Sequence, residues 1–296
     1  MSAAVSQNLT PSIVEAPPAG SSGAARIVRQ TLLWIGAIAA LLFAGTPFVF
    51  MIVTAFKSQG EFLSNMWGLP QQFNIDNFRQ VLEGGFARYL LNTALVSAGS
   101  VALTLLAAAL AAYPLARSRF RLQRPIFLLF LAGAMIPVHV TLIPTFILSR
   151  DLGLYDTRWA LLGPYIGFNL PLAIFILTEF MRQVPRELEE AALVDGASSW
   201  ERFSRIMLPL CVPAMSTVGI YAFIFVWNEF IFALVLLSSP EKMTMPLGLM
   251  QFYGQYQINV PGIMAALTLG SLPVIALYLV AQERVVAGLV AGALKG

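Results

Sequence analysis

The chain has 296 residues, of which 58% are hydrophobic and only 11% are charged, and its formal net charge at pH 7 is +3. A soluble domain carries roughly a quarter of charged residues, so this chain has too little polar surface to fold in water by itself. The small net charge and the scattered arginines argue against a nucleic-acid-binding protein. We therefore expect an all-α, polytopic membrane protein with one membrane domain.

The single cysteine and the single histidine restrict the available chemistry. Cys211 has no partner for an intrachain disulfide bond. His139 has no second histidine with which to share a metal ion, so we expect a structural role for it and no metal site. The chain also lacks the G-x-x-x-x-G-K-[ST], H-E-x-x-H and G-x-S-x-G motifs. These patterns predict a protein that is not an enzyme and that binds no cofactor itself.

The chain begins with a polar tail that precedes a series of long apolar stretches. Residues 1–25 are rich in Ala, Ser, Pro and Gly and lack apolar periodicity, which predicts a disordered tail ahead of a membrane domain at 26–296. A helix needs around 20 apolar residues to cross a bilayer core about 30 Å thick. The stretches that meet this length lie at about 32–56, 89–113, 125–148, 159–180, 211–237 and 263–281. They predict six transmembrane helices, the first of which is too long for a signal peptide.

The distribution of Lys and Arg predicts the orientation. The side that holds both termini, residues 117–124 and residues 181–210 carries twice as many of them as the other side. Because positive residues are retained in the cytoplasm, both termini are expected inside. The segments at 57–88, 149–158 and 238–262 are then outside, where they are candidates for contact with an extracytoplasmic partner.

The long cytoplasmic loop at 181–210 has the pattern of two short helices joined by a corner. Pro185 suits the start of the first helix, and Gly196 suits its end, because glycine adopts the left-handed conformation without strain. Ser198 and Glu201 form a Ser-x-x-Glu capping box for the second helix. Its expected apolar stripe consists of Trp200, Phe203, Met207 and Leu210. Such a helix fits a protein interface, and it also fits an amphipathic helix in the lipid headgroup layer.

The same loop resembles the EAA loop of ABC importer permeases at every position of that pattern. The matching residues are Glu190, Ala191, Ala192, Gly196, Ile206, Leu208 and Pro209. In that family this loop forms the coupling helix that docks into a cleft on the ATP-binding subunit. The resemblance implies that Glu190 and Gly196 hold the shape of the loop and that Ala191 and Ala192 permit close approach. The full set of residues implied for ATPase coupling is Glu190, Ala191, Ala192, Asp195, Gly196, Ser198, Trp200, Phe203, Ile206, Leu208 and Pro209.

The resemblance extends over nearly all of the chain after Arg29. The run from Trp227 to Phe230 and the C-terminal run at 288–296 look like carbohydrate-importer permeases of the maltose-transporter type, within which the chain resembles the shorter, six-span partner. This implies a bacterial inner-membrane protein that pairs with a second permease, an ATPase dimer carrying ATP and Mg, and an extracytoplasmic solute-binding protein. Membrane lipid is the remaining partner, and no nucleic acid is expected.

Glu229 is a carboxylate at membrane depth, where a charge costs on the order of 2.5 to 3.5 kcal/mol. Together with Trp227 and Asn228 it could line a sugar path, or it could simply bond to a neighbouring helix and stabilise the bundle. A secondary, ion-coupled transporter remains the alternative function, since it too would contain kinked helices and a buried carboxylate. A scaffold subunit without a path is a third reading, and the sequence does not identify the solute.

Overall fold

The structure is a computed structural model that describes residues 23–252 and 259–293, with side chains described for residues 27–250 and 259–280. Residues 1–22 of the expected tail lie outside this part, and α1 begins at Gly23. The first helices are α1 (Gly23–Ala55), α2 (Gln59–Ser64), α3 (Asp76–Val81), η1 (Leu82–Phe86), α4 (Ala87–Arg117), α5 (Gln123–Gly133) and α6 (Val138–Asp151). The described residues form helices and turns without strands, which confirms the all-α expectation.

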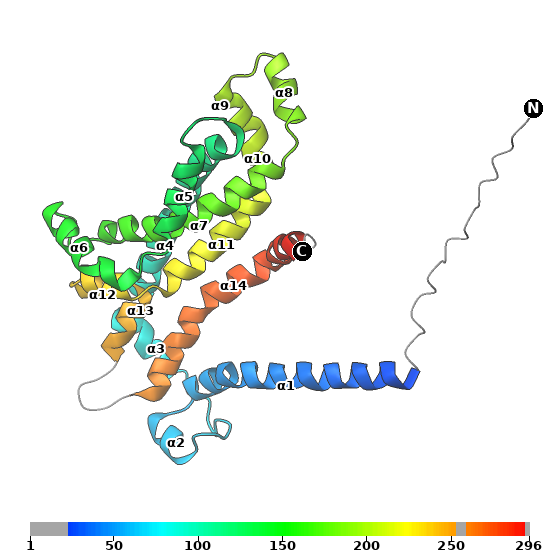
Figure 1. Ribbon diagram of the computed structural model, residues 1–296. Coiled ribbons are helices and arrows are strands. Elements are labelled where there is room, and N and C mark those ends of the chain that lie inside the picture. Colours follow the sequence, from blue (N-terminus) through cyan, green and yellow to red (C-terminus); the bar gives the residue numbers. More distant parts are fainter. Residues whose placement is uncertain (1–22, 253–258, 294–296) are drawn as a thin grey trace, which may run out of the picture. The chain divides into compact units, whose positions relative to one another are not determined.

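The second half of the chain continues in the same way (Figure 1). Its elements are η2 (Arg158–Leu161), α7 (Leu162–Gln183), α8 (Glu187–Val194), α9 (Ser199–Glu201), η3 (Arg202–Met207), α10 (Leu208–Leu210), α11 (Val212–Asn228), α12 (Ile231–Leu236), η4 (Pro240–Lys242), α13 (Met245–Gly248), η5 (Leu249–Phe252) and α14 (Val260–Ala293). The chain divides into two units, Met1–Phe50 and Met51–Gly296.

The first unit contains most of α1, and its apolar side chains are exposed. Leu41 is 71% exposed and Phe43 is 87% exposed. The stretch Ile27–Ala55 has a mean hydropathy of 2.2 and is long enough to cross a membrane. Apolar surface of this extent requires lipid or another protein to cover it.

The second unit contains three further helices that could cross a membrane and two bent helix pairs. The single helices are Asp76–Arg117, Arg158–Gln183 and Val260–Val280, and the pairs are Gln123–Gly133 with Val138–Asp151 and Ser199–Leu210 with Val212–Asn228. With α1, the described chain has four such helices, or up to six if each pair is one span. The length and composition of these helices therefore agree with six spans only when each bent pair is counted as one span.

The stretches expected as the third and fifth spans are each broken. The stretch at 125–148 turns by 95° between α5 and α6. Pro137 lies at this break and lacks an N–H group, and a proline also disfavours helical backbone at the residue before it. The stretch at 211–237 is interrupted between Asn228 and Ile231, where Glu229 has an extended backbone with ψ of 130°. Each of these two stretches therefore consists of two helices joined at a break.

The core of the second unit lies where α4, α7 and α11 pack together, and α4 makes its most extensive contact with α7 (Figure 1). One buried cluster near α12 and α13 includes Tyr165, Trp227 and Phe232. A second cluster near α8 to α10 includes Met181, Phe203 and Met207. The two clusters lie toward opposite ends of the same helices, so these helices connect the loop at 181–210 with the expected outer loops.

The expected outer loops are tied to each other by polar side chains. Asp156 accepts hydrogen bonds from the backbone N–H groups of Ser238 at 2.8 Å and Ser239 at 2.9 Å, and Lys242 Nζ lies 2.9 Å from its Oδ2. Asn92 on α4 donates to the carbonyl of Met243 at 2.9 Å. These contacts hold the segment before η2 and the segment around η4 against α4.

Candidate functional site

The helix α8 begins and ends with recognisable signals. Glu187, Glu189 and Glu190 occupy its first turn, where carboxylates interact favourably with the helix dipole. Gly196 has φ of +85°, and the N–H of Ala197 donates to the carbonyl of Ala192 at 2.9 Å. This left-handed glycine ends the helix, which confirms the expected corner. The helix starts two residues after Pro185, which was expected to be its first residue.

The second helix of the loop has the predicted capping box. The N–H of Glu201 donates to Ser198 Oγ at 3.2 Å, and the N–H of Ser198 donates to Glu201 Oε2 at 3.0 Å. The backbone hydrogen bond from Ser198 is the main reason why the pKa of Glu201 is lowered, followed by the Ser198 hydroxyl and by Arg205. The reciprocal bonds fix the entry of α9 without any partner protein.

The four residues predicted as one apolar stripe divide into two groups. Phe203 and Met207 are buried at 4% and 0% exposure, whereas Trp200 and Leu210 are exposed at 63% and 42%. Half of the expected apolar stripe therefore packs inside the protein, and the other half stays exposed. The π-helix η3 covers Arg202–Met207, and its extra residue per turn shifts the register that an α-helix would have.

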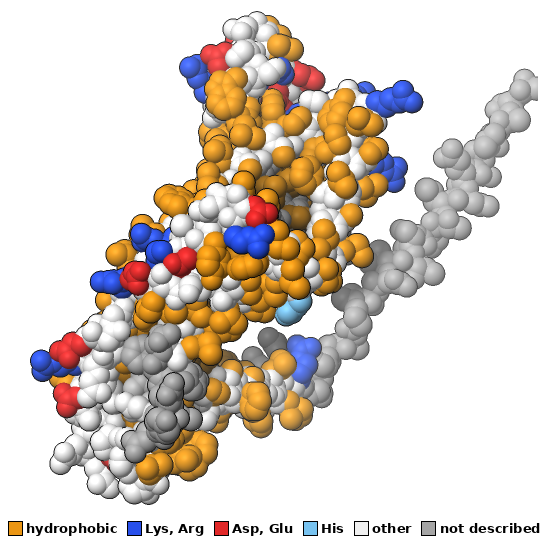
Figure 2. Space-filling model, turned by 90° about the vertical axis from the view of Figure 1, so that its left-hand side faces the viewer, with side chains coloured by type: hydrophobic (Ala, Val, Ile, Leu, Met, Phe, Trp, Pro, Cys, Tyr) orange, Lys and Arg blue, Asp and Glu red, His pale blue; other side chains and the backbone are white. Residues whose placement is uncertain are grey.

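The exposed surface of the loop is formed mainly by α8 and its corner. Leu193 is 55% exposed and Val194 is 87% exposed. Glu190, Ala191, Asp195 and Gly196 are also exposed, whereas Ala192 and Ile206 are half-buried. Charged side chains lie at the end of the visible face that carries α8 and α9, and hydrophobic side chains cover much of the face beyond it (Figure 2).

Glu189 is the residue that sequence reasoning missed. Its Oε2 lies 2.8 Å from Arg117 Nε, and its Oε1 accepts a 2.6 Å hydrogen bond from the Tyr113 hydroxyl. Its position in the first turn of α8 by itself indicates only an interaction with the helix dipole. Tyr113 and Arg117 are four residues apart, which places them on one face of α4, but no local pattern identifies their partner in a distant segment.

A second candidate site lies at the break between α11 and α12. Glu229 Oε2 accepts a 2.6 Å hydrogen bond from Tyr165, and Oε1 accepts a 2.8 Å hydrogen bond from the N–H of Phe232. The carboxylate therefore caps α12 and bonds to α7. This contact is the bundle-stabilising role that the sequence left open beside the sugar path.

Glu229 and Asn228 also line a groove of about 650 Å³. Its other lining residues are Val138, His139, Tyr221, Ile224, Phe225, Phe230 and Ile231. The groove thus joins the start of α6 to the break after α11, so both helix breaks contribute to it. Trp227, expected beside Asn228 in a path, is instead buried at 2% exposure and donates to the carbonyl of Gly270 at 3.1 Å.

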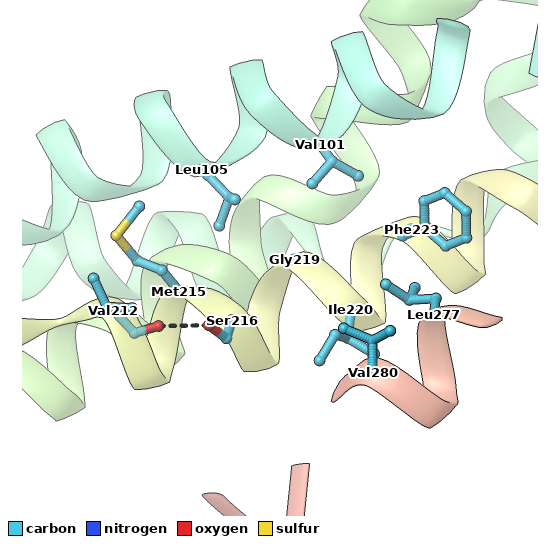
Figure 3. A pocket seen from close by; sticks show the side chains of 10 residues that line it. All are labelled: Val101, Leu105, Val212, Met215, Ser216, Gly219, Ile220, Phe223, Leu277 and Val280. Atoms are coloured by element: carbon cyan, nitrogen blue, oxygen red, sulfur yellow. Dashed lines mark hydrogen bonds between the residues drawn. The ribbon is translucent and has the colours of Figure 1, made fainter. Parts of the chain in front are cut away.

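Another groove, of about 430 Å³, lies between α4, α11 and α14 (Figure 3). Val101, Leu105 and Gly219 lie along it, and Ser216 is the one lining residue with a polar side chain. The Ser216 hydroxyl donates to the carbonyl of Val212 at 2.8 Å. This groove therefore offers a polar solute almost no hydrogen-bonding partner. Among the described residues, no cluster of His, Cys, Asp and Glu could hold a metal ion.

Comparison with known proteins identifies the family to which this chain belongs. The family model described as "Binding-protein-dependent transport system inner membrane component" matches residues 100–290. The chain belongs to this family. These inner membrane components are the permease subunits of ABC transporters, so the family suggested by the loop is confirmed. The protein is a multi-pass membrane protein by this membership and by its apolar helices.

Individual relatives of this chain are also ABC transporter proteins. A protein of Caldicellulosiruptor sp. (strain Rt8B.4), which carries the name ABC transporter permease protein ORF2, is 47% identical over 272 residues, covering 91% of this chain and 99% of that protein. The trehalose/maltose transport system permease protein MalG of Thermococcus litoralis is 34% identical, covering 91% and 98%. A chain in the crystal structure of a bacterial ABC transporter that imports the acidic polysaccharide alginate matches with a TM-score of 0.74 and 25% identity, covering 89% and 98%.

Proposed function

We propose that this chain is the permease subunit of an importer that moves a sugar or sugar-like solute into the bacterial cytoplasm by alternating access. The named relatives support the solute class, because trehalose/maltose and alginate transport appear among them. In the inner membrane both termini would face the cytoplasm, which follows from the excess of Lys and Arg on that side.

Its partners would be a second, related permease, an ATPase dimer and an extracytoplasmic solute-binding protein. The chain has no phosphate-binding loop, so ATP and Mg would be held by the ATPase subunits. The apolar outer surface of α1 supports pairing with another membrane subunit. The family's dependence on a binding protein supports the third partner.

The loop at 181–210 is the observation that carries the proposal. Its corner is fixed by Gly196 and by the Ser198–Glu201 capping box, so α8 keeps its shape without a partner. Leu188, Val194 and Trp200 nevertheless remain exposed on it, at 45%, 87% and 63%. A rigid helix with exposed apolar side chains suits docking into a cleft of the ATPase. An ion-coupled transporter would not need such an element.

The groove at the two helix breaks is the proposed part of the solute path in this subunit. Transporters commonly place their solute at discontinuous helices near the membrane midplane. The Nδ2 of Asn228 donates to the carbonyl of Ile224 at 2.8 Å, so this side chain offers the solute its oxygen as an acceptor. The ring of Tyr221 offers an apolar face, and a sugar ring uses both kinds of contact. Trp227 is left out of this path because it is buried in the core.

The decisive experiment measures solute-stimulated ATP hydrolysis by the reconstituted complex with a panel of sugars. We expect one sugar class to stimulate wild type, and we expect Gly196→Asp to abolish stimulation with loss of the ATPase subunits during purification. Gly60→Ala is the control, because Gly60 has open space around it and no positive φ. A stimulated and fully assembled Gly196→Asp complex would refute the docking role of the loop.

A further inference from the structure

We infer that the Arg117–Glu189 ion pair, with Tyr113, is the link that carries motion of the ATPase-docking helix α8 into the long helix α4. This inference rests on the proposed function, because it assigns the element that transmits the docking motion. Glu189 and Arg117 are then positioning residues, and neither contacts the solute.

The three side chains form one connected cluster, which we call the α4–α8 clasp, and they also line a groove of about 520 Å³. The side chains of Arg117 and Glu189 are 7% and 8% exposed, and they lie 2.8 Å apart. Tyr113 donates to the second carboxylate oxygen at 2.6 Å. Arg117 also donates to the carbonyl of Val184 at 2.6 Å, so α4 contacts the segment that leads into α8 as well as α8 itself.

Besides the clasp, α8 packs mainly against η3, which follows it in the chain. Glu189 is its one buried residue, whereas Leu188 and Leu193 are 45% and 55% exposed. When a partner pushes on α8, the clasp is the contact that passes this force to α4, beside the packing of α8 on η3. The clasp therefore lies directly between the docking surface and the membrane helices.

The helix α4 is suited to carry the motion across the unit. It is continuous from Ala87 to Arg117, and it packs along α7. Near its other end Asn92 donates to the carbonyl of Met243 at 2.9 Å, and Thr93 accepts from the N–H of Met245 at 2.7 Å. At 1.5 Å per residue, these contacts lie about 36 Å from Arg117 along the axis. One continuous helix thus joins the clasp to the expected outer loops.

Stability alone gives little reason for an ion pair at this position. Desolvation of two charges offsets most of their attraction, so apolar residues of similar volume often fold equally well. The clasp differs from an apolar contact in direction, because the hydrogen bonds from Tyr113 to Glu189 and from Arg117 to the carbonyl of Val184 fix the orientation of α8 relative to α4. The fixed orientation of α8 relative to α4 is therefore the best explanation for the clasp.

The test compares transport per ATP in reconstituted complexes of wild type, the double variant Arg117→Met with Glu189→Met, and Tyr113→Phe. We expect both variant complexes to retain their ATPase subunits. The amount of solute imported per ATP hydrolysed should fall in the double variant by about threefold to thirtyfold, the range expected for loss of a coupling contact. Tyr113→Phe should lower the same ratio by a smaller factor.

A purely structural role predicts an unchanged ratio in every variant that assembles, and that result would overturn the inference. If the double variant fails to assemble, Tyr113→Phe decides, because it removes one hydroxyl and keeps the ion pair. The matched control is Arg79→Gln with Glu83→Gln, an ion pair whose side chains are 75% and 62% exposed. Absence of solute-stimulated hydrolysis in wild type would instead refute the proposed importer function itself.

Discussion

The hydroxyl of Tyr165 on α7 donates a 2.6 Å hydrogen bond to the carboxylate of Glu229, at the point where α11 ends. The same carboxylate accepts from the N–H of Phe232 at 2.8 Å in the first turn of α12. One side chain therefore joins three helices at a break in the membrane domain. The cost of a carboxylate at this depth is offset by these donors, each of which would otherwise lack a partner.

Tyr165→Phe should destabilise the protein, because it removes the 2.6 Å hydrogen bond to Glu229 Oε2 and leaves that oxygen only the 3.4 Å contact with the N–H of Ala233. A hydrogen bond to a charged group contributes about 1.5–3 kcal/mol, and its loss should appear as a lower melting temperature of the purified complex in detergent. Tyr278→Phe is the control, because Tyr278 is 57% exposed. Equal melting temperatures of Tyr165→Phe and wild type would show that this bond does not stabilise the break.

Trp227 and Asn228 are neighbours in sequence, but we expect opposite effects from changing them. Trp227→Phe removes the buried hydrogen bond to Gly270 and should lower stability by about 1–3 kcal/mol with no effect on solute preference. Asn228→Ala alters an exposed residue of the groove and should weaken solute-stimulated ATP hydrolysis with little change in melting temperature. Solute titrations and thermal melts of both variants separate the two roles. A change of solute preference in Trp227→Phe would contradict this assignment.

Asp156→Asn should weaken the contact between the expected outer loops. Asp156 has φ of 54°, a conformation that Asn also tolerates, so the substitution removes the charge without adding backbone strain. The amide still offers an oxygen to Ser238 and Ser239, but the ion pair with Lys242 is lost. We expect a loss of about 1–2 kcal/mol in the free energy of unfolding. Asp151→Asn, at an exposed ion pair with Arg150, should change it by less than about 0.5 kcal/mol.

The effect of Asp156→Asn should depend on pH in a definite direction. Burial raises the pKa of Asp156, but the hydrogen bonds from Ser239, Lys242 and Ser238 together outweigh it and hold the pKa well below its usual range. A lowered folded-state pKa contributes stability that is present above the unfolded pKa and is lost as pH falls. The difference between wild type and variant should be constant above about pH 5 and shrink below about pH 4. A difference that grows on acidification would contradict this account.

Lys57→Met should loosen the segment after α1. Lys57 is fully buried, and its Nζ donates to the carbonyls of Asn65 at 2.7 Å and Met66 at 3.0 Å. Methionine fills the space but leaves both carbonyls without this donor, at a cost of about 1–3 kcal/mol. Hydrogen exchange should become faster over residues 58–75 and remain unchanged in α7. Arg79→Gln is the control at a 75% exposed side chain, and unchanged exchange in Lys57→Met would exclude the anchoring role.

Several features of the loop at 181–210 were predictable because they depend on short-range chemistry. Gly196 ends α8 by its own backbone freedom, and Ser198 and Glu201 cap α9 through residues three apart. The burial of Phe203 and Met207 was not predictable, because both side chains pack in a cluster with residues of α4, α7 and α11, which are distant in the sequence.

The sequence by itself determined that this chain is a helical membrane protein of the permease family, because apolar length, charge bias and the loop motif are local properties. Only the tertiary structure decided which charges have partners. The pairs that it formed are distant in the sequence. Tyr113 and Glu189 are separated by 76 residues, and Tyr165 and Glu229 are separated by 64. Such pairs form because burial removes water as a competing partner, and burial is a property of the packed helices.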